Sequence, residues 1–483
     1  MHLTDLELSQ STGGSWRSSE AAGGFVARTV CTDTRQLREG DLFVALKGEN
    51  GDGHDYLDRA VEGGAGALVI HRADAAASVP ESLPVLIVPD TLRALGDIAM
   101  AWRAKCPAHR TAIVGSAGKT TTKDMLAMLL RHALAEKGKG EETVLASKGN
   151  FNNLIGVPLT LFRLEPSHKW AILELGMNEP GELKRLTQIA EPDLLVFLAV
   201  GSAHVGQFAS RAALLEAKSD ALRTLGGNVP VLYDAASPNT CEIIRKYSGR
   251  RPLLSFAVER PADISARNVQ ARPRGGYTFD LDFGTVTAPV CLPVFGRYNV
   301  ANATAAAGAA HILGARPEKI GQAFETYRPS NMRSEVREAG GVTLIVDCYN
   351  ASPEGMAGAL ESLRDLPNSE GRTFLVLGEM LELGEESAEH HGRIGRIAAD
   401  LAPDGVFLIG EGIAAVRDAW QGPAEAVSHF TRHEDLARAL IRAVRPGDRV
   451  FFKGSRGKRL EVVVDLLTKA LEAPRPARPP NTQ

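Results

Sequence analysis

The stretch from Thr111 to Met125 constrains the fold more than any other part of the sequence. A short β-prone run is followed by the turn Gly-Ser-Ala-Gly and then by a segment of helical period, in which apolar residues such as Leu126 and Leu130 lie four positions apart. A strand, a glycine turn and a helix N-terminus together build an anion site, because unpaired backbone N–H groups and the positive helix end point at one spot. This context predicts a nucleotide phosphate site.

The chemistry of this turn depends on a few residues. Gly115 and Gly118 allow the tight turn and a close backbone approach, Lys119 adds a charge against β/γ-phosphates, and the Thr120 hydroxyl is a candidate Mg²⁺ ligand. Ile113 stands where the full G-x-x-x-x-G-K-[ST] pattern has its first glycine, so a chance match in a glycine loop is the alternative. The predicted phosphate contacts are Gly115, Ser116, Ala117, Gly118, Lys119, Thr120 and Thr121.

Length and composition indicate an ordinary globular chain of several domains. At 483 residues, and roughly 150 residues per domain, about three domains are expected. The net charge of −3 argues against nucleic acid or an anionic membrane as a partner. We expect a cytoplasmic protein, because the first residues contain no signal-like segment and no apolar run reaches membrane-spanning length. We also expect a monomer. The five cysteines include no Cys-x-x-Cys pair, which predicts reduced thiols.

The order of apolar runs predicts three α/β domains. Residues 1–105 form an N-terminal domain whose predicted buried strand, 42–46, leads into a polar, glycine-rich loop; a phosphate cradle and a plain surface turn are equally favoured there. In residues 106–328 strands alternate with helices, which predicts a parallel sheet, except that residues from about 250 to 295 resemble short antiparallel strands.

The last part of the chain predicts a Rossmann-like domain over residues 329–472, with four strand candidates separated by segments of helix length. The proline-rich tail, residues 473–483, is expected to be disordered.

Three further residues are candidates for chemistry in the central domain. Glu174 and His204 come at or just beyond the ends of two apolar strands, where open α/β sheets place their ligands. Taken singly, each is more often a structural residue. Lys218 would ordinarily be a solvated helix lysine.

Several longer motifs occur in a fixed order along the chain. They are Gly115-Ser-Ala-Gly-Lys-Thr-Thr-Thr-Lys-Asp124, Gly149-Asn-Phe-Asn-Asn-Leu-Ile-Gly-Val-Pro-Leu-Thr160, Glu174-Leu-Gly-Met-Asn-Glu-Pro-Gly-Glu182, Gly296-Arg-Tyr-Asn-Val-Ala-Asn302, Asp347-Cys-Tyr-Asn-Ala-Ser-Pro-Glu-Gly-Met356, Leu377-Gly-Glu-Met-Leu-Glu-Leu-Gly384 and Lys453-Gly-Ser-Arg456. Together they resemble the Mur ligase family, the ATP-dependent amide ligases of peptidoglycan precursor synthesis. The resemblance runs from Thr32 to Leu460 and implies a three-domain architecture with a P-loop central domain.

The resemblance implies a reaction in which ATP converts a peptide carboxylate to an acyl phosphate, which an amine then attacks. The Asp-x-Tyr-Asn-Ala-x-Pro and Gly-Glu-Met-Leu-Glu-Leu-Gly motifs are most similar to those members that add D-alanyl-D-alanine to UDP-N-acetylmuramoyl-tripeptide, which would place the protein in cell wall biogenesis, cell shape and division. The C-terminal domain would bind the incoming amine.

The same resemblance assigns residues to ligands. Lys119, Glu174, His204 and Lys218 would be the catalytic set. One Mg²⁺ would be held by Thr120 and Glu174, and a second by His204 and a carbamylated Lys218, since a carbamate supplies the anionic oxygen that Mg²⁺ prefers. The other implied contacts are Asn299 and Asn302 to adenine, Arg333 and Asp347 to phosphate and ribose, Thr34, Arg35 and Lys47 to the uridine diphosphate side, and Asn152, Asn153 and Asn350 to the peptide substrates.

The sequence departs from the family pattern in two places. Gly206, in Ala203-His-Val-Gly206, stands where the family usually has glutamate, and Lys218-Ser-Asp220 replaces Lys-Gly-Glu. The altered Ala203-His-Val-Gly206 stretch supports one alternative, a catalytically weak ATP-binding scaffold. A second alternative, a sister ligase that adds a single amino acid to a muramoyl-peptide or polyglutamyl acceptor, depends on the amine pocket of the third domain.

Overall fold

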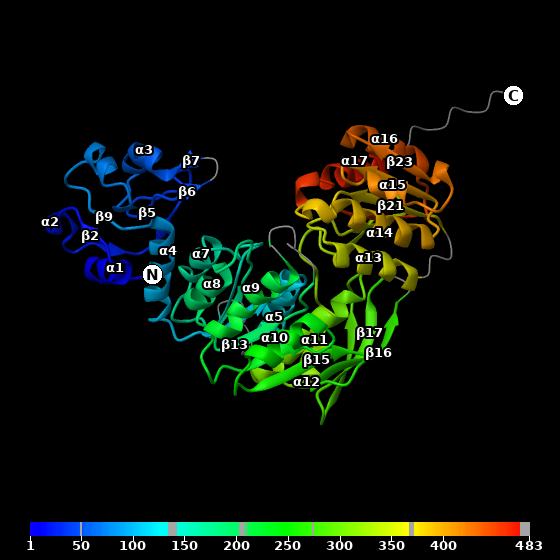
Figure 1. Cartoon of the computed structure of the whole chain (residues 1–483), viewed down its shortest axis with the longest axis horizontal. Helices are drawn as coiled ribbons and strands as arrows, with labels where there is room; N and C mark the ends of the chain where they lie inside the picture. The colour runs from blue at the N-terminus through cyan, green and yellow to red at the C-terminus, as the bar shows by residue number, and fades with distance from the viewer. Residues whose placement is uncertain are drawn as a thin grey trace.

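The computed structural model describes residues 1–48, 51–133, 143–201, 208, 210–272, 275–366 and 371–473. Figure 1 shows three α/β parts in chain order, with the N-terminal part (blue) and the C-terminal part (orange to red) on opposite sides of the central part (green). Each part contains one main sheet. The class predicted from the sequence, a three-domain α/β protein, is confirmed; the domain boundaries stay predictions.

The N-terminal part is built on a five-stranded sheet. Its strands are β2 (Ser15–Trp16), β4 (Val30–Cys31), β5 (Leu42–Val44), β8 (Ala67–Ile70) and β9 (Val85–Ile87), in the order β2-β9-β8-β5-β4. Shorter ladders join β1 (Leu3–Thr4) to β3 (Val26–Ala27) and β6 (Lys47–Gly48) to β7 (Gly51–Asp52). The helices are α1 (Asp5–Thr12), α2 (Ser19–Ala22), η1 (Gly53–Tyr56), α3 (Leu57–Glu62), η2 (Ala73–Ser78) and α4 (Thr91–Arg103). The strand predicted at 42–46 is therefore present as the buried β5.

The central part contains a nine-stranded mixed sheet. Its strands are β10 (His109–Val114), β11 (Val144–Ala146), β12 (Trp170–Glu174), β13 (Leu194–Phe197), β14 (Val231–Asp234), β15 (Leu253–Val258), β16 (Ile264–Ala271), β17 (Tyr277–Asp282) and β18 (Thr287–Leu292), in the order β11-β12-β10-β13-β14-β15-β16-β17-β18. Its helices are α5 (Lys119–Ala133), α7 (Gly156–Leu161), α8 (Glu182–Ala190), α9 (Arg211–Thr224), α10 (Pro238–Tyr247), α11 (Tyr298–Ile312) and α12 (Pro317–Phe324).

The antiparallel pairing predicted for residues 250–295 is right for β16, β17 and β18 but wrong for β15. That strand runs parallel to both β14 and β16. The reason is α10, which supplies a crossover helix between β14 and β15 and so continues the parallel sheet by one more strand.

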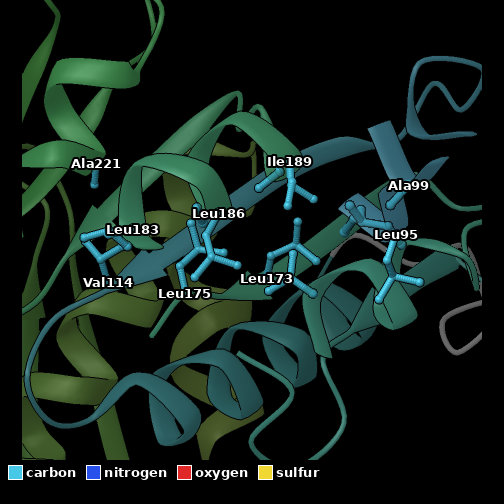
Figure 2. Packing of buried hydrophobic residues seen from close by; sticks show 14 of the residues in the cluster. Leu95, Ala99, Val114, Leu173, Leu175, Leu183, Leu186, Ile189 and Ala221 are labelled. Atoms are coloured by element: carbon cyan, nitrogen blue, oxygen red, sulfur yellow. The ribbon is translucent and has the colours of Figure 1, made fainter. Parts of the chain in front are cut away.

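One face of the central sheet shares its core with the N-terminal part. Figure 2 shows Leu95 and Ala99 of α4 beside Ile189 of α8, with Leu173 of β12 beneath them. The helix α4 begins at a cap in which the Asp90 carboxylate accepts the Arg93 N–H at 2.7 Å. Each such fully buried leucine or isoleucine contributes about 1.5–3 kcal/mol, so this packing fixes the strands that end at the phosphate turn.

The other face of the central sheet is covered by α5, α11 and α12. The helix α11 is rich in alanine, and residues such as Ala303, Ala306 and Ala310 are buried with Leu126 and Leu129 of α5. Small side chains let the two helices approach closely, which brings the first turn of α11 against the phosphate turn at the start of α5.

The C-terminal part is a six-stranded sheet flanked by helices. Its strands are β19 (Glu335–Ala339), β20 (Val342–Val346), β21 (Thr373–Gly378), β22 (Gly405–Ile409), β23 (Val427–Phe430) and β24 (Arg449–Lys453), in the order β19-β20-β24-β21-β22-β23, with β19 alone antiparallel to its neighbour. Its helices are α13 (Pro353–Asp365), η4 (Gly384–Glu386), α14 (Ser387–Asp400), α15 (Ala414–Asp418), η5 (Ala424–Ala426), α16 (His433–Ala443), η6 (Arg456–Lys458) and α17 (Glu461–Glu472).

The four predicted C-terminal strands are present as β20, β21, β22 and β24. The two strands that the sequence did not reveal, β19 and β23, are the edges of the sheet. Both are half-exposed, so neither carries the continuous apolar run by which a buried strand is recognised. The predicted disordered tail lies outside the described residues, apart from Ala473.

Candidate functional site

The turn between β10 and α5 has the geometry of a phosphate loop. Gly115 has φ 148° and Gly118 has φ 81°. A Cβ atom on Gly118 would lie 2.2 Å from Asn302 Oδ1, and one on Gly115 would lie 2.7 Å from Leu198 Cβ. Both positions therefore require glycine, and the first helical residue after the turn is Lys119.

The Lys119 ammonium group is folded back over the turn. Its Nζ donates to the carbonyl oxygens of Gly115 at 2.9 Å and Ser116 at 3.3 Å. Burial lowers the pKa of Lys119, and the nearby Glu174 carboxylate opposes that shift. A phosphate group in the turn would offer this amine a stronger, charged acceptor than two carbonyl oxygens.

Glu174, at the end of β12, is buried beside the phosphate turn. Its Oε2 accepts a hydrogen bond from Thr120 Oγ1 at 2.7 Å, and its Oε1 accepts one from Asn152 Nδ2 at 2.8 Å. A carboxylate and a hydroxyl oxygen at the start of a P-loop helix are the kinds of ligand that Mg²⁺ prefers, so the donor set fits the expected ion. Among the described residues no cluster of three or more His, Cys, Asp or Glu side chains forms a ready metal site.

Lys218 is not the solvated helix lysine that its position on α9 would ordinarily suggest. Only 3% of the residue is exposed. Within the described part of the chain no hydrogen bond or ion pair of Lys218 is found. Burial, together with the charge of Lys119, lowers the pKa of Lys218 to about 7. About half of its amine is therefore in the neutral, nucleophilic form at pH 7.

His204, the other residue predicted to hold the second metal ion, lies outside the described residues. The Ala203–Gly206 departure from the family pattern lies outside them too.

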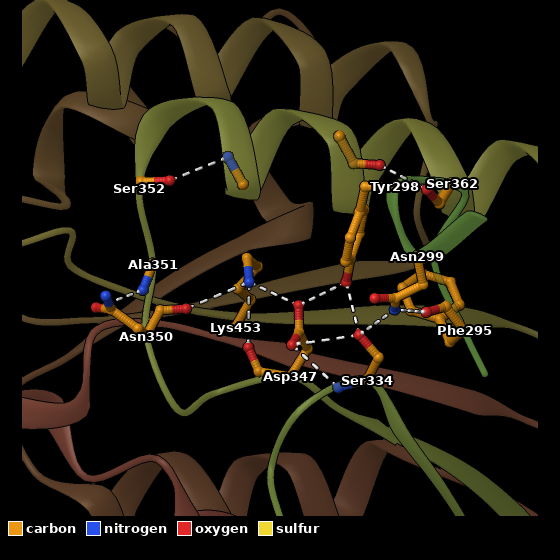
Figure 3. A network of polar contacts seen from close by, with 12 residues as sticks. Phe295, Tyr298, Asn299, Ser334, Asp347, Asn350, Ala351, Ser352, Ser362 and Lys453 are labelled. Atoms are coloured by element: carbon orange, nitrogen blue, oxygen red, sulfur yellow. Dashed lines mark hydrogen bonds and ion pairs between the residues drawn. The ribbon is translucent and has the colours of Figure 1, made fainter. Parts of the chain in front are cut away.

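The C-terminal side of the site is a network of paired polar groups centred on Asp347 (Figure 3). The Asp347 carboxylate accepts hydrogen bonds from Lys453 Nζ at 2.6 Å, from Tyr298 OH at 2.9 Å and from the Ser334 N–H at 3.0 Å. Burial and the Asp347 charge raise the pKa of Tyr298 well above its usual range, so this phenol remains a donor. The network joins α11 to the C-terminal sheet.

Two asparagines of α11 connect this network to the phosphate turn. Asn299 Nδ2 donates to Phe295 O at 2.7 Å and to Ser334 Oγ at 3.1 Å, and its Oδ1 accepts from Asn302 Nδ2 at 2.9 Å. Asn302 faces the cavity, whereas Asn299 is buried behind it and is not among the lining residues.

Both sides face one cavity of about 530 Å³. The predicted site residues that line it are Ser116, Ala117, Gly118, Lys119, Thr120, Thr121, Asn152, Asn153, Glu174, Lys218, Asn302, Arg333, Asp347 and Asn350. The Arg333 guanidinium stacks over the Tyr349 ring, 3.9 Å from its centroid. The structure thus gathers residues from two domains, up to 234 positions apart in sequence (116 to 350), around one space.

The three residues predicted for the uridine diphosphate side do not line this cavity. Thr34, Arg35 and Lys47 lie in the N-terminal part. Arg35 forms an ion pair of 2.8 Å with Asp33, and hydrogen bonds from the Arg35 side chain and backbone lower the pKa of Asp33 to about 2.

Sequence reasoning missed several residues that line the cavity. They are Tyr298, Ser334, Tyr349, Glu354, Lys453 and Arg456. All except Ser334 lie inside the quoted motifs, so the motifs marked the segments without indicating which side chains face the cavity.

Comparison with known proteins agrees with this geometry. Three family models match in chain order: the Mur ligase family, catalytic domain, over residues 27–103; the Mur ligase middle domain over residues 113–310; and the Mur ligase, glutamate ligase domain, over residues 332–456. The chain belongs to the Mur ligase family. The resemblance drawn from the sequence motifs is therefore confirmed.

Among its relatives are enzymes of one named activity. The chain is 32% identical to the UDP-N-acetylmuramoyl-tripeptide–D-alanyl-D-alanine ligase of Bacillus subtilis, over 92% of this chain and 94% of that protein. It is 34% identical to the ligase of the same name from Escherichia coli, over 91% and 93%. Among solved structures, MurF from Acinetobacter baumannii superimposes with a TM-score of 0.87 at 29% identity, over 97% of this chain and 99% of that one. MurF from Thermotoga maritima in complex with ADP gives 0.80 at 28% identity, over 92% and 98%.

Proposed function

We propose that this chain is an ATP-dependent ligase that adds D-alanyl-D-alanine to UDP-N-acetylmuramoyl-tripeptide in peptidoglycan precursor synthesis. The observation that carries the proposal is the single cavity in which a phosphate loop of the central domain faces a polar wall of the C-terminal domain. The extent of the likeness to ligases of this name, more than nine-tenths of both chains, supports the same activity.

The phosphate turn binds the nucleotide. Backbone N–H groups of the Ser116–Thr121 segment and the Lys119 ammonium surround the β- and γ-phosphates. Thr120 and Glu174 would hold Mg²⁺, which would supply positive charge to neutralise the phosphates. Asn302, which lies beside Gly118 of the turn, contacts the adenine, with Asn299 behind it.

The rest of the nucleotide and the acceptor substrate occupy the neighbouring surfaces. Arg333 and Asp347 contact the phosphate and the ribose of the nucleotide. Asn152 and Asn153 face the muramoyl-peptide, whose uridine diphosphate end reaches Thr34, Arg35 and Lys47. Asn350 lies on the side of the incoming amine. With the peptide carboxylate held beside the γ-phosphate, transfer gives an acyl phosphate, a good leaving group that the amine displaces to form the amide.

Lys218 is proposed to be carbamylated. Its buried amine has no anionic partner among the described residues, and with a pKa of about 7 about half of it is neutral at pH 7, which is the form that adds to carbon dioxide. The carbamate and His204 would hold a second Mg²⁺. The test is intact-protein and peptide mass spectrometry under bicarbonate: we expect a labile addition at Lys218 that is absent from Lys218→Arg. An unmodified amine in fully active enzyme would contradict this.

The assay that tests the whole proposal measures phosphate release from ATP. Turnover should require both UDP-N-acetylmuramoyl-tripeptide and D-alanyl-D-alanine. Turnover with a single amino acid in place of the dipeptide would indicate a sister ligase instead. Nucleotide binding without turnover for any substrate pair would indicate the weak ATP-binding scaffold.

We further propose that the enzyme acts in the cytoplasm as a monomer, with domains at residues 1–105, 106–328 and 329–472. No helix in the described part of the chain is both long and apolar enough to cross a membrane.

A further inference from the structure

A second cavity, of about 820 Å³, lies between α5, the loop after β11 and the segment that joins the central domain to the C-terminal domain. We call it the basic cavity, after the charges of its lining. It meets the cavity of the candidate site at Thr120, Arg333 and Tyr349, which line both. None of the residues assigned to the muramoyl-peptide or its uridine diphosphate lines it. The reaction proposed above therefore gives the basic cavity no role.

The lining of the basic cavity carries an excess of positive charge. Six of its residues are lysine or arginine, whereas Asp124 is its single carboxylate in the described part of the chain. Lys123 is paired with that carboxylate at 3.0 Å. The other five cations form no ion pair with any described residue: Arg131, Lys148, Arg163, Arg328 and Arg333. In a chain whose net charge is −3, unpaired cations gathered around one space repel one another and attract an anion.

Two buried donors of the lining also indicate an anion. Tyr327 is 2% exposed, and its hydroxyl has no hydrogen-bond partner among the described residues. Burial raises the pKa of Tyr327, so the phenol stays a donor. The Arg131 Nε–H is buried and unpaired among the described residues too, although Nη2 of the same side chain donates to Val144 O at 3.3 Å. Buried donors are nearly always paired, and an anion in the cavity would supply the acceptor that both of these need.

We propose that the basic cavity binds the phosphate groups of a small polyanion, at a site separate from the phosphate turn. Guanidinium groups pair with phosphate oxygens through two parallel hydrogen bonds, and five unpaired cations fit an anion of several charges better than a single carboxylate. The phosphates belong either to a free polyphosphate chain or to a nucleotide. In the second case the base would lie against the apolar part of the lining, which includes Ala127, Met128 and Leu145.

An anion in the basic cavity should weaken the binding of nucleotide at the phosphate turn. Arg333 lines both cavities, so the two ligands compete for its hydrogen bonds, and their negative charges repel each other. This coupling rests on the nucleotide site of the proposed function. Because coupling between two sites is reciprocal, ADP should weaken the binding of the polyanion by the same factor, which we expect to be about fivefold.

Calorimetric titration of the full chain with tripolyphosphate tests the proposal, with ADP at saturation so that the phosphate turn is filled. One equivalent of tripolyphosphate should still bind. Arg131→Gln should raise its Kd about tenfold and leave the Kd of ADP within about twofold. Replacing tripolyphosphate by GTP separates the two sources of phosphate: tighter binding would identify a nucleotide, and equal binding a bare phosphate chain.

Tyr327→Phe removes one hydroxyl and nothing else. It should raise the Kd of tripolyphosphate about tenfold, and it should not lower the melting temperature, because the hydroxyl has no hydrogen-bond partner among the described residues. The matched controls are Tyr277→Phe, at a fully buried tyrosine, and Arg245→Gln, at an exposed arginine on α10. Neither residue lines either cavity, so both variants should bind tripolyphosphate as the wild type does.

Three results would overturn the proposal. No binding of tripolyphosphate to the ADP-saturated protein would show that the phosphate turn is the site at which this anion binds. Binding that Arg131→Gln and Tyr327→Phe both leave unchanged would place the anion outside the basic cavity. Tighter binding of citrate than of tripolyphosphate would assign the cavity to carboxylates. A failure of ADP itself to bind would count against the proposed function alone, since weaker tripolyphosphate binding in Arg131→Gln would still identify the basic cavity.

Discussion

The two walls of the cavity hold their charges in different ways. The central wall, formed by the phosphate turn, Glu174 and Lys218, contains two lysines whose amines have no carboxylate within ion-pair distance among the described residues. The C-terminal wall, formed by Ser334, Asp347 and Lys453 with Tyr298 packed on it, contains a buried ion pair of 2.6 Å in which each group has further hydrogen bonds.

The charges of the central wall serve to bind a ligand, whereas those of the C-terminal wall stabilise the fold. The Lys119 ammonium, which bonds only to carbonyl oxygens of its own turn in the described residues, adds little to the stability of the empty protein and gains a charged partner only when phosphate arrives. A buried ion pair that is fully hydrogen-bonded is instead part of the fold, because losing one member leaves the other charge buried without compensation. Substitutions in the central wall should therefore reduce activity and spare stability, and substitutions in the C-terminal wall should reduce both.

The largest effect on activity is expected for Lys119→Ala. Its amine bonds only to carbonyl oxygens of its own turn in the described residues, so phosphate binding and transfer lose their main side-chain charge. We expect turnover to fall by about a thousandfold or more with an unchanged melting temperature. Phosphate-release assays and calorimetry measure the two quantities. Lys184→Ala, an exposed lysine on α8, is the control, and a cooperative transition lost in Lys119→Ala would contradict the comparison.

Asp347→Asn should affect stability and nucleotide binding together. Lys453, 5% exposed, would lose its charged partner, at a cost of about 3–5 kcal/mol in the free energy of unfolding. Titration with ADP and calorimetric melting measure the outcome.

The double variant Asp347→Asn/Lys453→Met sharpens this prediction. Because the unpaired Lys453 ammonium is removed, the double variant should regain part of the lost stability and none of the lost ADP affinity. A single variant as stable as the wild type would show that the C-terminal wall is not held by this pair.

The central wall was easier to predict from the sequence than the C-terminal wall for a physical reason. Gly118, Lys119 and Thr120 are consecutive, so their placement depends on local turn and helix geometry, which short motifs encode. The pairing of Asp347 with Lys453 spans 106 positions, and the contact of Glu354 with Gly201 crosses two domains.

The burial of single side chains could not be predicted from the sequence either. Lys218 lies on a helix of mixed polarity, and only the packing of α9 against the rest of the central domain decides whether its amine meets solvent. The edge strands β19 and β23 were not predicted, because their side chains are only partly buried in the folded sheet. The four inner strands of that sheet were predicted, because each is a continuous apolar run.

The smallest effect concerns His391, which holds one loop of the C-terminal wall. Its buried ring donates from Nδ1 to Ser387 O at 2.8 Å and accepts the Met380 N–H at Nε2 at 2.9 Å, next to residues 381–383, which line the cavity. Burial lowers the pKa of His391. Below the unfolded-state pKa of about 6.5 the unfolded chain binds a proton that the folded protein does not, so stability falls as pH falls through that range.

His391→Gln removes this titration while keeping an acceptor for the Met380 N–H. At neutral pH the variant should be less stable by about 1 kcal/mol, and the difference from the wild type should narrow as pH approaches about 5. Calorimetric melting across pH measures this, with His132→Gln, an exposed histidine on α5, as the control. A difference that stays constant with pH would show that His391 acts through packing alone. A rise in the KM for D-alanyl-D-alanine without a change in ATP affinity would show that the loop it holds serves the amine side of the cavity.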